Sequence, residues 1–445
     1  MQNLLIYSNL QGRRVAAQSS FKNPNIKRHW RPIDETEMKA FIAILVLSGA
    51  YGDNYQSTID MWSFRDGRPI YRALMSRERF IEIKKVIRLD DPLRRNKQDP
   101  LAPVRDTMTL FNEKLLEYYI PGPYLTIDEQ LVEFHGRVKF KQYIPSKPGK
   151  FGIKLFWMCD SNNWYCLNGL PYIGTGTLPS SERVSSAEVV LHLARPFFGS
   201  GRNITGDNWF TSYELVTKLL SQRLTYVGTI RSNRSCVPRC MLATAGRVRK
   251  DTQIVHDGNQ TYMCSFWDKG TKPVLLLDSF SSNLVVPEAG QKPETVQFYN
   301  KTKSGVDIMD KLVRALSTHR KCRRWPFVIL CNIFDISVLN GSIIHKTTQT
   351  GLTESQKQRY HKQYALSTGY QLAQDHLTRR VSCSRIGIEV KENIHKLLGN
   401  MPRGAPDYAT SGLVRATTQK RCLICPRGMD KKLHTHAANV RNPCA

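Results

Sequence analysis

The order of hydrophobic patterns between residues 121 and 230 is the feature that most limits what this chain can fold into. Residues 125–132 alternate like a strand, and residues 154–159 and 164–172 are two further strand-like runs joined by a polar turn. A helical stretch at 185–194, a short strand at 202–206, a helix ending at 220 and a strand at 224–230 follow. The predicted order is therefore three strands, helix, strand, helix, strand.

That order is typical of a three-stranded antiparallel meander extended by parallel βα units, as in a ribonuclease H-like core. Several α/β folds begin in the same way, so the order alone does not single out one of them. Residues 231–300 contain short strand-like runs separated by polar turns, and we interpret them as a β-rich insertion before the fold resumes.

Helical patterns flank this region. We expect helices across residues 30–120, where Asp34 followed by Glu37 forms a helix start, and again from Gly305. The apolar run Trp325–Ile344 is long, but the polar residues within it favour a buried helix over a membrane span.

The charge of the chain indicates a polyanionic partner. Lys and Arg total 65 and Asp and Glu total 37, which gives 65 − 37 = +28, and residues 301–445 alone supply 25 − 9 = +16. Nucleic acid is the commonest polyanion, although a solubilising surface is the simpler alternative. The odd number of cysteines, 11, and an N-terminus without a secretory signal predict a reducing compartment, nuclear or cytoplasmic.

Three aspartates stand out by their positions. Asp128 lies in the first predicted strand and Asp207 directly follows the fourth, and these two strands are neighbours in a ribonuclease H-like sheet. Asp307 opens the helix after the insertion, with Asp310 on nearly the same helical face. Each one alone is better explained as a turn or cap residue. Together they predict an acidic centre.

Clustered carboxylates suit one kind of chemistry. Cleaving a phosphodiester requires charge neutralisation, an activated hydroxyl or water, and a stabilised leaving oxyanion, and two Mg²⁺ or Mn²⁺ ions supply all three. These ions prefer hard oxygen ligands. The sequence therefore predicts that Asp128, Asp207 and Asp307 bind two Mg²⁺ or Mn²⁺ ions.

Six sequence motifs in a fixed order closely resemble those of the piggyBac-type DNA transposases, over roughly residues 30 to 340. They are LTIDEQ at 125–130, YIPSKP at 143–148 with GIK at 152–154, DNWFTS at 207–212, GTIRSN at 228–233, GVD at 305–307 with Asp310, and RWP at 324–326.

The resemblance implies a fold and an activity. It implies a ribonuclease H-like catalytic core with an Asp-Asp-Asp triad, a β-rich insertion, and a helical DNA-binding and dimerisation domain formed from two chain segments. It also implies cleavage of double-stranded DNA at transposon ends through a hairpin, joining to TTAA targets, a homodimer and a nuclear location. Asp310 matches a fourth acidic position beside the triad.

The resemblance also implies which residues bind DNA. Lys147, Lys150 and Lys154 follow the first catalytic strand, where a bound DNA strand must pass, although a solvated basic face is the alternative. Arg231 and Arg234 match positions associated with target DNA. The remaining predicted DNA-binding residues are Arg137, Tyr143, Asn208 and Trp325, of which Trp325 either stacks on a displaced base or caps its own apolar helix.

The chain departs from the family at two places. The family often has Arg-Gly-Arg where this chain has His135-Gly136-Arg137, and a histidine is a weaker phosphate contact. Family members end in a cysteine-rich zinc domain, of which Cys422 and Cys425 resemble the first half. Cys444 and one histidine complete four ligands, but at no standard zinc spacing, so a zinc site and its loss both stay open.

Two hypotheses for the function follow. The intact aspartates favour a catalytic transposase, whereas ends shorter than those of the family favour a domesticated or decayed copy that binds DNA or protein partners without catalysis. The predicted boundaries are 1–120 and 321–400 for the helical domain, 121–230 and 301–320 for the catalytic core, 231–300 for the insertion and 401–445 for the basic tail with its incomplete zinc domain.

Overall fold

The computed structural model describes residues 1–22, 29–174, 176–178, 185–288, 290–399, 415–420 and 433–435. The chain divides into two compact units. The first comprises Met1–Phe111, Phe134–Val138 and Leu312–Gly412, and the second comprises Asn112–Glu133, Lys139–Lys311 and Leu413–Ala445. Each unit is therefore assembled from segments that are distant in sequence.

The first unit is helical. Its helices are α1 (Gln2–Lys22), α2 (Glu35–Tyr51), α3 (Thr58–Met61), α4 (Pro69–Leu74), α5 (Arg77–Val86), α11 (Trp325–Thr347), α12 (Glu354–Val381) and α13 (Ile388–Gly399), and the unit boundaries fall within α6 (Arg105–Tyr118) and α10 (Gly305–Ala315). The helical character expected for residues 30–120 is confirmed for α2 to α6.

Helix α2 forms the centre of this unit. Asp34 caps its N-terminus by accepting a hydrogen bond of 2.8 Å from the Glu37 backbone N–H, as the sequence predicts, and Gly52 at φ +77° ends it. Almost every side chain between these caps is buried. Helix α12 packs along α2 at Gly369, where a Cβ atom would lie only 2.6 Å from Leu47. Glycine is therefore needed for this close helix approach.

Helix α11 is long and apolar enough to cross a membrane by length and composition alone. Its most apolar window is 67% buried inside the protein, and Asn332, Asp335 and Asn340 are buried with it. This burial is what a core helix shows, in agreement with the interpretation of the sequence.

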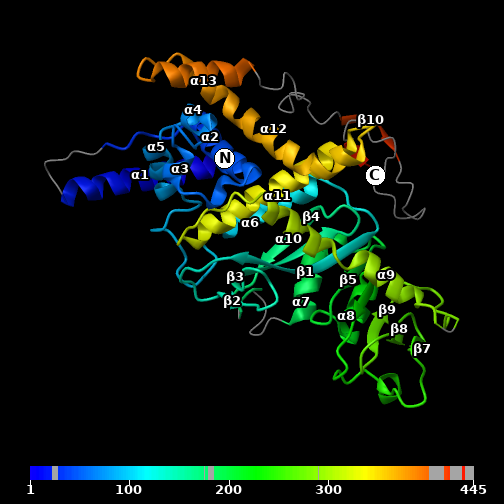
Figure 1. Ribbon diagram of the computed structural model, residues 1–445. Coiled ribbons are helices and arrows are strands. Elements are labelled where there is room, and N and C mark those ends of the chain that lie inside the picture. Colours follow the sequence, from blue (N-terminus) through cyan, green and yellow to red (C-terminus); the bar gives the residue numbers. More distant parts are fainter. Residues whose placement is uncertain are drawn as a thin grey trace. The chain divides into compact units, whose positions relative to one another are not determined.

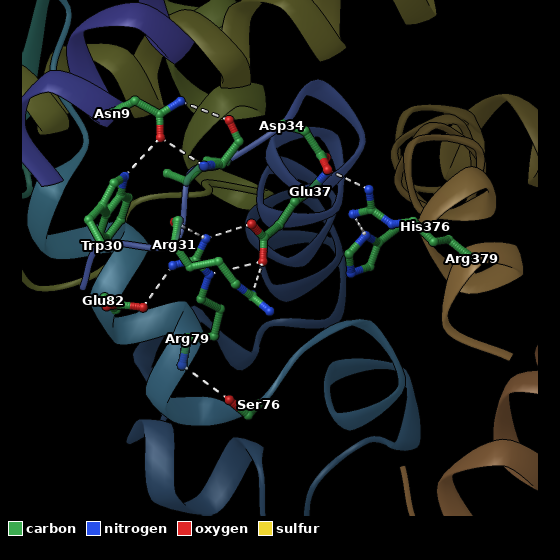
Figure 2. Close-up of polar contacts among 11 residues, drawn as sticks. Asn9, Trp30, Arg31, Asp34, Glu37, Ser76, Arg79, Glu82, His376 and Arg379 are labelled. Carbon is green, nitrogen blue, oxygen red and sulfur yellow. Dashed lines mark hydrogen bonds and ion pairs between the residues drawn. The ribbon is translucent and has the colours of Figure 1, made fainter. Parts of the chain in front are cut away.

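A buried ion pair connects α2 with α5 (Figure 2). Arg79 donates to both carboxylate oxygens of Glu37, at 2.9 and 2.7 Å, and both side chains are less than 10% exposed. Arg31 donates to the same carboxylate from the segment before α2, and Arg379 of α12 donates to Asp34 at 2.5 Å. Polar contacts thus join three helices at the N-terminus of α2.

The second unit contains a mixed sheet (Figure 1). Its strands are β1 (Tyr124–Glu133), β2 (Gln142–Tyr143), β3 (Phe151–Asp160), β4 (Cys166–Pro171), β5 (Asn203–Gly206), β6 (Thr225–Thr229), β7 (Asp251–His256), β8 (Tyr262–Trp267) and β9 (Val274–Asp278). Strands β4, β3 and β1 are antiparallel neighbours, and β1, β5 and β6 are parallel neighbours. Apart from the two-residue β2, this is the predicted order, with α7 (Ser186–Ala194) and α8 (Tyr213–Ser221) between the parallel strands.

Strands β7 to β9 come from the segment interpreted as an insertion. They do not form a sheet of their own, because β9 pairs antiparallel with β6 and the sheet continues through β8 to β7. The chain then enters α9 (Glu294–Thr302).

Helices cover both faces of this sheet. Asn168 of β4 donates to Leu193 O of α7 at 3.1 Å. Asn168 pairs with Met158, which pairs with Ile127 of β1, so these three side chains lie on the same face of the sheet. Thr126 points to the other face, because side chains alternate along a strand, and its hydroxyl donates to Thr302 O of α9 at 2.5 Å. Helices α7 and α9 therefore lie on opposite faces.

Candidate active site

Asp128 and Asp207 occupy equivalent positions on neighbouring parallel strands. Strand β1 pairs with β5 in the register Thr126↔Thr205, and each aspartate follows its threonine by two residues. Neighbouring strands lie about 4.8 Å apart. The sheet therefore brings together two carboxyl groups separated by 207 − 128 = 79 positions in the chain.

Asp307 reaches this place on α10, which follows α9 closely. The hydroxyl of Thr302 at the end of α9 bonds the hydroxyl of Thr205 at 2.8 Å, so the start of α10 is held beside β1 and β5. Asp307 lies in the first turn of α10. Its side chain is 60% exposed.

Asp310 lies one turn further along α10 and has a different environment. It is 2% exposed, and its carboxylate accepts a hydrogen bond of 2.9 Å from the Gln130 side chain. The carbonyl of the same amide accepts from the Trp157 indole N–H at 2.9 Å. Asp310 thus contacts the sheet through Gln130.

Burial and neighbouring charges shift the pKa values of the groups around this centre. Burial, with the negative charges of Glu129 and Asp307, raises the pKa of Asp128 to about 7. Burial and the charge of Glu129 also raise the pKa of Asp207. Burial raises the pKa of the Tyr299 phenol on α9, and the charges of Asp207, Asp128 and Asp307 all add to that shift. Tyr299 is thus within electrostatic range of all three predicted ligands.

Two lysines face these carboxylates. Lys147 Nζ donates to Asp307 Oδ1 and to the backbone carbonyl of Glu129, both at 3.1 Å. Lys154 Nζ lies 3.4 Å from Glu129 Oε2 and 4.7 to 5.8 Å from the ring centres of Phe156, Trp209 and Tyr172. Both lysine side chains are largely buried, so the carboxylate cluster already contains counter-charges.

Within the described ranges, no three His, Cys, Asp or Glu side chains are close enough together to hold one metal ion. Mg²⁺ is often bound by one or two carboxylates and completed by water and phosphate oxygens. The donor set, which consists of oxygens only, matches that chemistry.

Five predicted DNA-binding residues of the second unit are exposed. Tyr143 is 57% exposed and packs against Phe151, while Lys150 takes a left-handed φ of +51° in the turn before β3. The others are Asn208, Arg231 and Arg234. Asn208 Oδ1 accepts from Arg231 Nε at 3.1 Å, so the residue after Asp207 is joined to the turn after β6.

The basic run before α11 is partly buried. Arg324 donates to the backbone carbonyls of Ile87 and Lys84, so its guanidinium is held inside the first unit, whereas Arg323 is exposed. Trp325 is the first residue of α11 and is half-buried. Arg137, in the same unit, is exposed.

Sequence reasoning missed two residues near the aspartates. Glu129 follows Asp128 and points to the other face of β1, yet its charge reaches both Asp128 and Asp207. Tyr299 lies on α9, outside every motif used. Glu129 pairs with the largely buried Lys154 on the neighbouring strand β3. The sequence alone does not reveal this pairing, because it depends on the register of β1 and β3.

The predicted zinc ligands Cys422 and Cys425, with Cys444, lie outside the described residues. The zinc site therefore stays a prediction. The eight cysteines of the described ranges are all free.

The chain is similar to known transposases. A family model described as Transposase IS4 matches residues 1–342. The PiggyBac transposable element-derived protein 3 of Homo sapiens is 25% identical over 338 residues, which cover 71% of this chain and 56% of that protein. The Chimeric ERCC6-PGBD3 protein of Homo sapiens is also 25% identical, with 31% of its length covered. The matched region thus spans about half or less of these curated relatives.

A solved structure is similar over nearly the whole chain. It is a piggyBac transposase in a synaptic complex with hairpin DNA, studied by cryo-electron microscopy, with 32% sequence identity and a TM-score of 0.80. The similarity covers 97% of this chain and 89% of that one. Because the family model spans most of the chain and the solved relative matches in both sequence and fold, this chain belongs to the piggyBac-type family of DNA transposases.

Proposed function

We propose that this protein is a metal-dependent transposase that cuts DNA at transposon ends and joins the ends to TTAA targets. The observation that carries the proposal is the register of β1 and β5, in which Asp128 and Asp207 each follow one of two paired threonines by two residues. The charge of Asp307 contributes to the raised pKa of Asp128, which supports including Asp307 in the same centre. The strand order β4-β3-β1-β5-β6 supports a ribonuclease H-like core.

The three aspartates are the proposed metal ligands. The carboxylate oxygens of Asp128, Asp207 and Asp307 would hold the two ions, and waters and phosphate oxygens would complete them. When bound, Mg²⁺ or Mn²⁺ would polarise the phosphate and lower the pKa of the attacking water or hydroxyl. Asp310, buried against Gln130, would orient α10 and thereby Asp307.

The exposed polar residues around this centre are the proposed DNA contacts. Asn208 directly follows Asp207 and pairs with Arg231, and Arg234 lies in the same turn as Arg231. Tyr143 and Lys150 flank the turn that contains Lys147. In the first unit, Arg137 and Trp325 are further proposed contacts. The solved relative in complex with hairpin DNA supports binding of double-stranded DNA.

The remaining assignments rest on the family. We propose a homodimer in the nucleus, with residues 1–120 and 321–400 as the helical DNA-binding and dimerisation domain. The core would comprise 121–230 and 301–320, the insertion 231–300, and the basic tail 401–445, where zinc could bind.

The decisive experiment incubates the purified protein with a labelled transposon-end duplex and Mg²⁺ or Mn²⁺. Nicking that requires metal and disappears in Asp207→Ala supports the proposal. An intact duplex with the wild-type protein, or equal nicking by the variant, would instead favour a copy that binds DNA without cutting it.

Metal binding should depend on pH. Because the pKa of Asp128 is about 7 in the metal-free protein, protons compete with metal below that pH, and affinity for Mn²⁺ should fall by up to about tenfold per pH unit. The measurement is a Mn²⁺ titration followed by electron paramagnetic resonance between pH 5.5 and 8.5. A flat profile would contradict the assignment of Asp128 as a ligand.

A further inference from the structure

Lys147 is held by the backbone of a tight turn between β2 and β3. Ile144 N–H donates to Lys150 O at 2.8 Å, Lys147 N–H to Ile144 O at 3.1 Å, and Lys150 N–H to Lys147 O at 3.0 Å. This network fixes the Cα position of Lys147, so only its side chain is free to change direction. The side chain is 16% exposed and ends on Asp307 Oδ1.

The position of the ammonium group matters because of what surrounds it. It contacts Asp307 directly and the backbone carbonyl of Glu129, and it lies within electrostatic range of Asp128. It therefore lies near two of the three carboxylates that are proposed to hold metal. Lys154 has the corresponding position between Glu129 and Asp207, but three aromatic rings enclose it.

We propose that Lys147 is a resident counter-ion of the metal-free acidic centre, which an arriving divalent cation displaces from Asp307. This inference rests on the proposed function, since it assumes that Asp307 binds metal. Upon displacement the ammonium group keeps its proton and its charge, and its four-carbon stem allows it to turn outward, where it can face a DNA phosphate. Metal binding would thereby release a DNA contact.

Charge and geometry both favour replacement of the Lys147 ammonium group by a divalent cation at Asp307. One carboxylate oxygen cannot accept from an ammonium group and bind a metal in the same direction, and a divalent ion gains about twice the Coulomb attraction of an ammonium group at equal distance. Lys154 cannot exchange as readily, because leaving its site means losing three cation–π contacts as well as Glu129. The displaced group is therefore Lys147.

The first test measures metal affinity without DNA. In Lys147→Met the competing cation is gone, and Mn²⁺ should bind roughly tenfold more tightly than to the wild-type protein, as measured by electron paramagnetic resonance. Lys139→Met, which removes an exposed lysine of the same unit, should bind as the wild type does. Equal or weaker binding by Lys147→Met, or no binding by either protein, overturns the proposal.

The second test observes the lysine itself. Acetylation of the wild-type protein by an N-hydroxysuccinimide ester, read out by mass spectrometry, should increase severalfold at Lys147 when Mn²⁺ is added, with Lys139 labelled equally in both states. Unchanged labelling of Lys147 in metal-saturated protein overturns the displacement. Neither test uses cleavage, so failure of the nicking assay and failure of this proposal give separate results.

Discussion

Replacing Asp128 with Asn is expected to abolish DNA cleavage while leaving the fold intact. The substitution keeps the shape of the side chain but removes the charge of a proposed metal ligand. Losing several kcal/mol of transition-state stabilisation corresponds to a rate reduction of about 10³-fold or more. The measurement is the rate of nicking of a transposon-end duplex in Mg²⁺.

The stability of this variant should move in the opposite direction. The folded protein raises the pKa of Asp128 from its ordinary value of 3.8 to about 7, so the stability provided by the protonated form is lost as the pH rises through 7. Asparagine is neutral at every pH. In a chelator at pH 8, Asp128→Asn should therefore resist urea at least as well as the wild type. A clear loss of stability would show that Asp128 is needed for the fold, and undiminished nicking would show that it is not a ligand.

Breaking the Glu37–Arg79 pair is expected to have the largest effect on stability. Arg79→Met removes the buried partner of Glu37 and leaves this carboxylate buried, with the largely exposed Arg31 as its remaining direct ion-pair partner among the described residues. The loss should cost about 3–5 kcal/mol of unfolding free energy. Urea-induced unfolding measures the change.

A matched control exists on the same helix. Arg77 is 37% exposed and pairs with the exposed Glu78, so Arg77→Met should change the unfolding free energy by less than about 1 kcal/mol. The double variant Glu37→Leu/Arg79→Met removes both buried charges and should recover much of the loss. Equal effects of Arg77→Met and Arg79→Met would refute the importance of burial.

The sequence predicted the positions that depend on chain order and local pattern. The alternation of apolar and polar residues predicted β1. The expectation that the first and fourth long strands are neighbours predicted that Asp128, within β1, and Asp207, directly after β5, belong to adjacent strands, as the pairing of β1 with β5 shows. The start of α2 at Asp34 followed from local capping chemistry.

Other positions depend on contacts with distant residues. The sequence predicts Lys154 as a phosphate contact but does not show that the ring centre of Trp209, 209 − 154 = 55 residues later, lies 4.9 Å from its ammonium group. Arg324 is bound by carbonyls that lie more than 200 residues earlier in the chain. Pattern reasoning assigns a face to a side chain, but not the partner on that face, and this partner decides whether a basic residue is available to DNA.

The pairing of β9 with β6 also has a consequence during synthesis. Synthesis releases β1, β5 and β6 first, then β7, β8 and β9, and only afterwards Thr302, which bonds Thr126 across 176 residues. Contacts of such long sequence separation form late in folding. A growing chain that ends before α10 therefore holds two of the three carboxylates, and an enzyme proposed to cut DNA becomes competent only when most of it has left the ribosome.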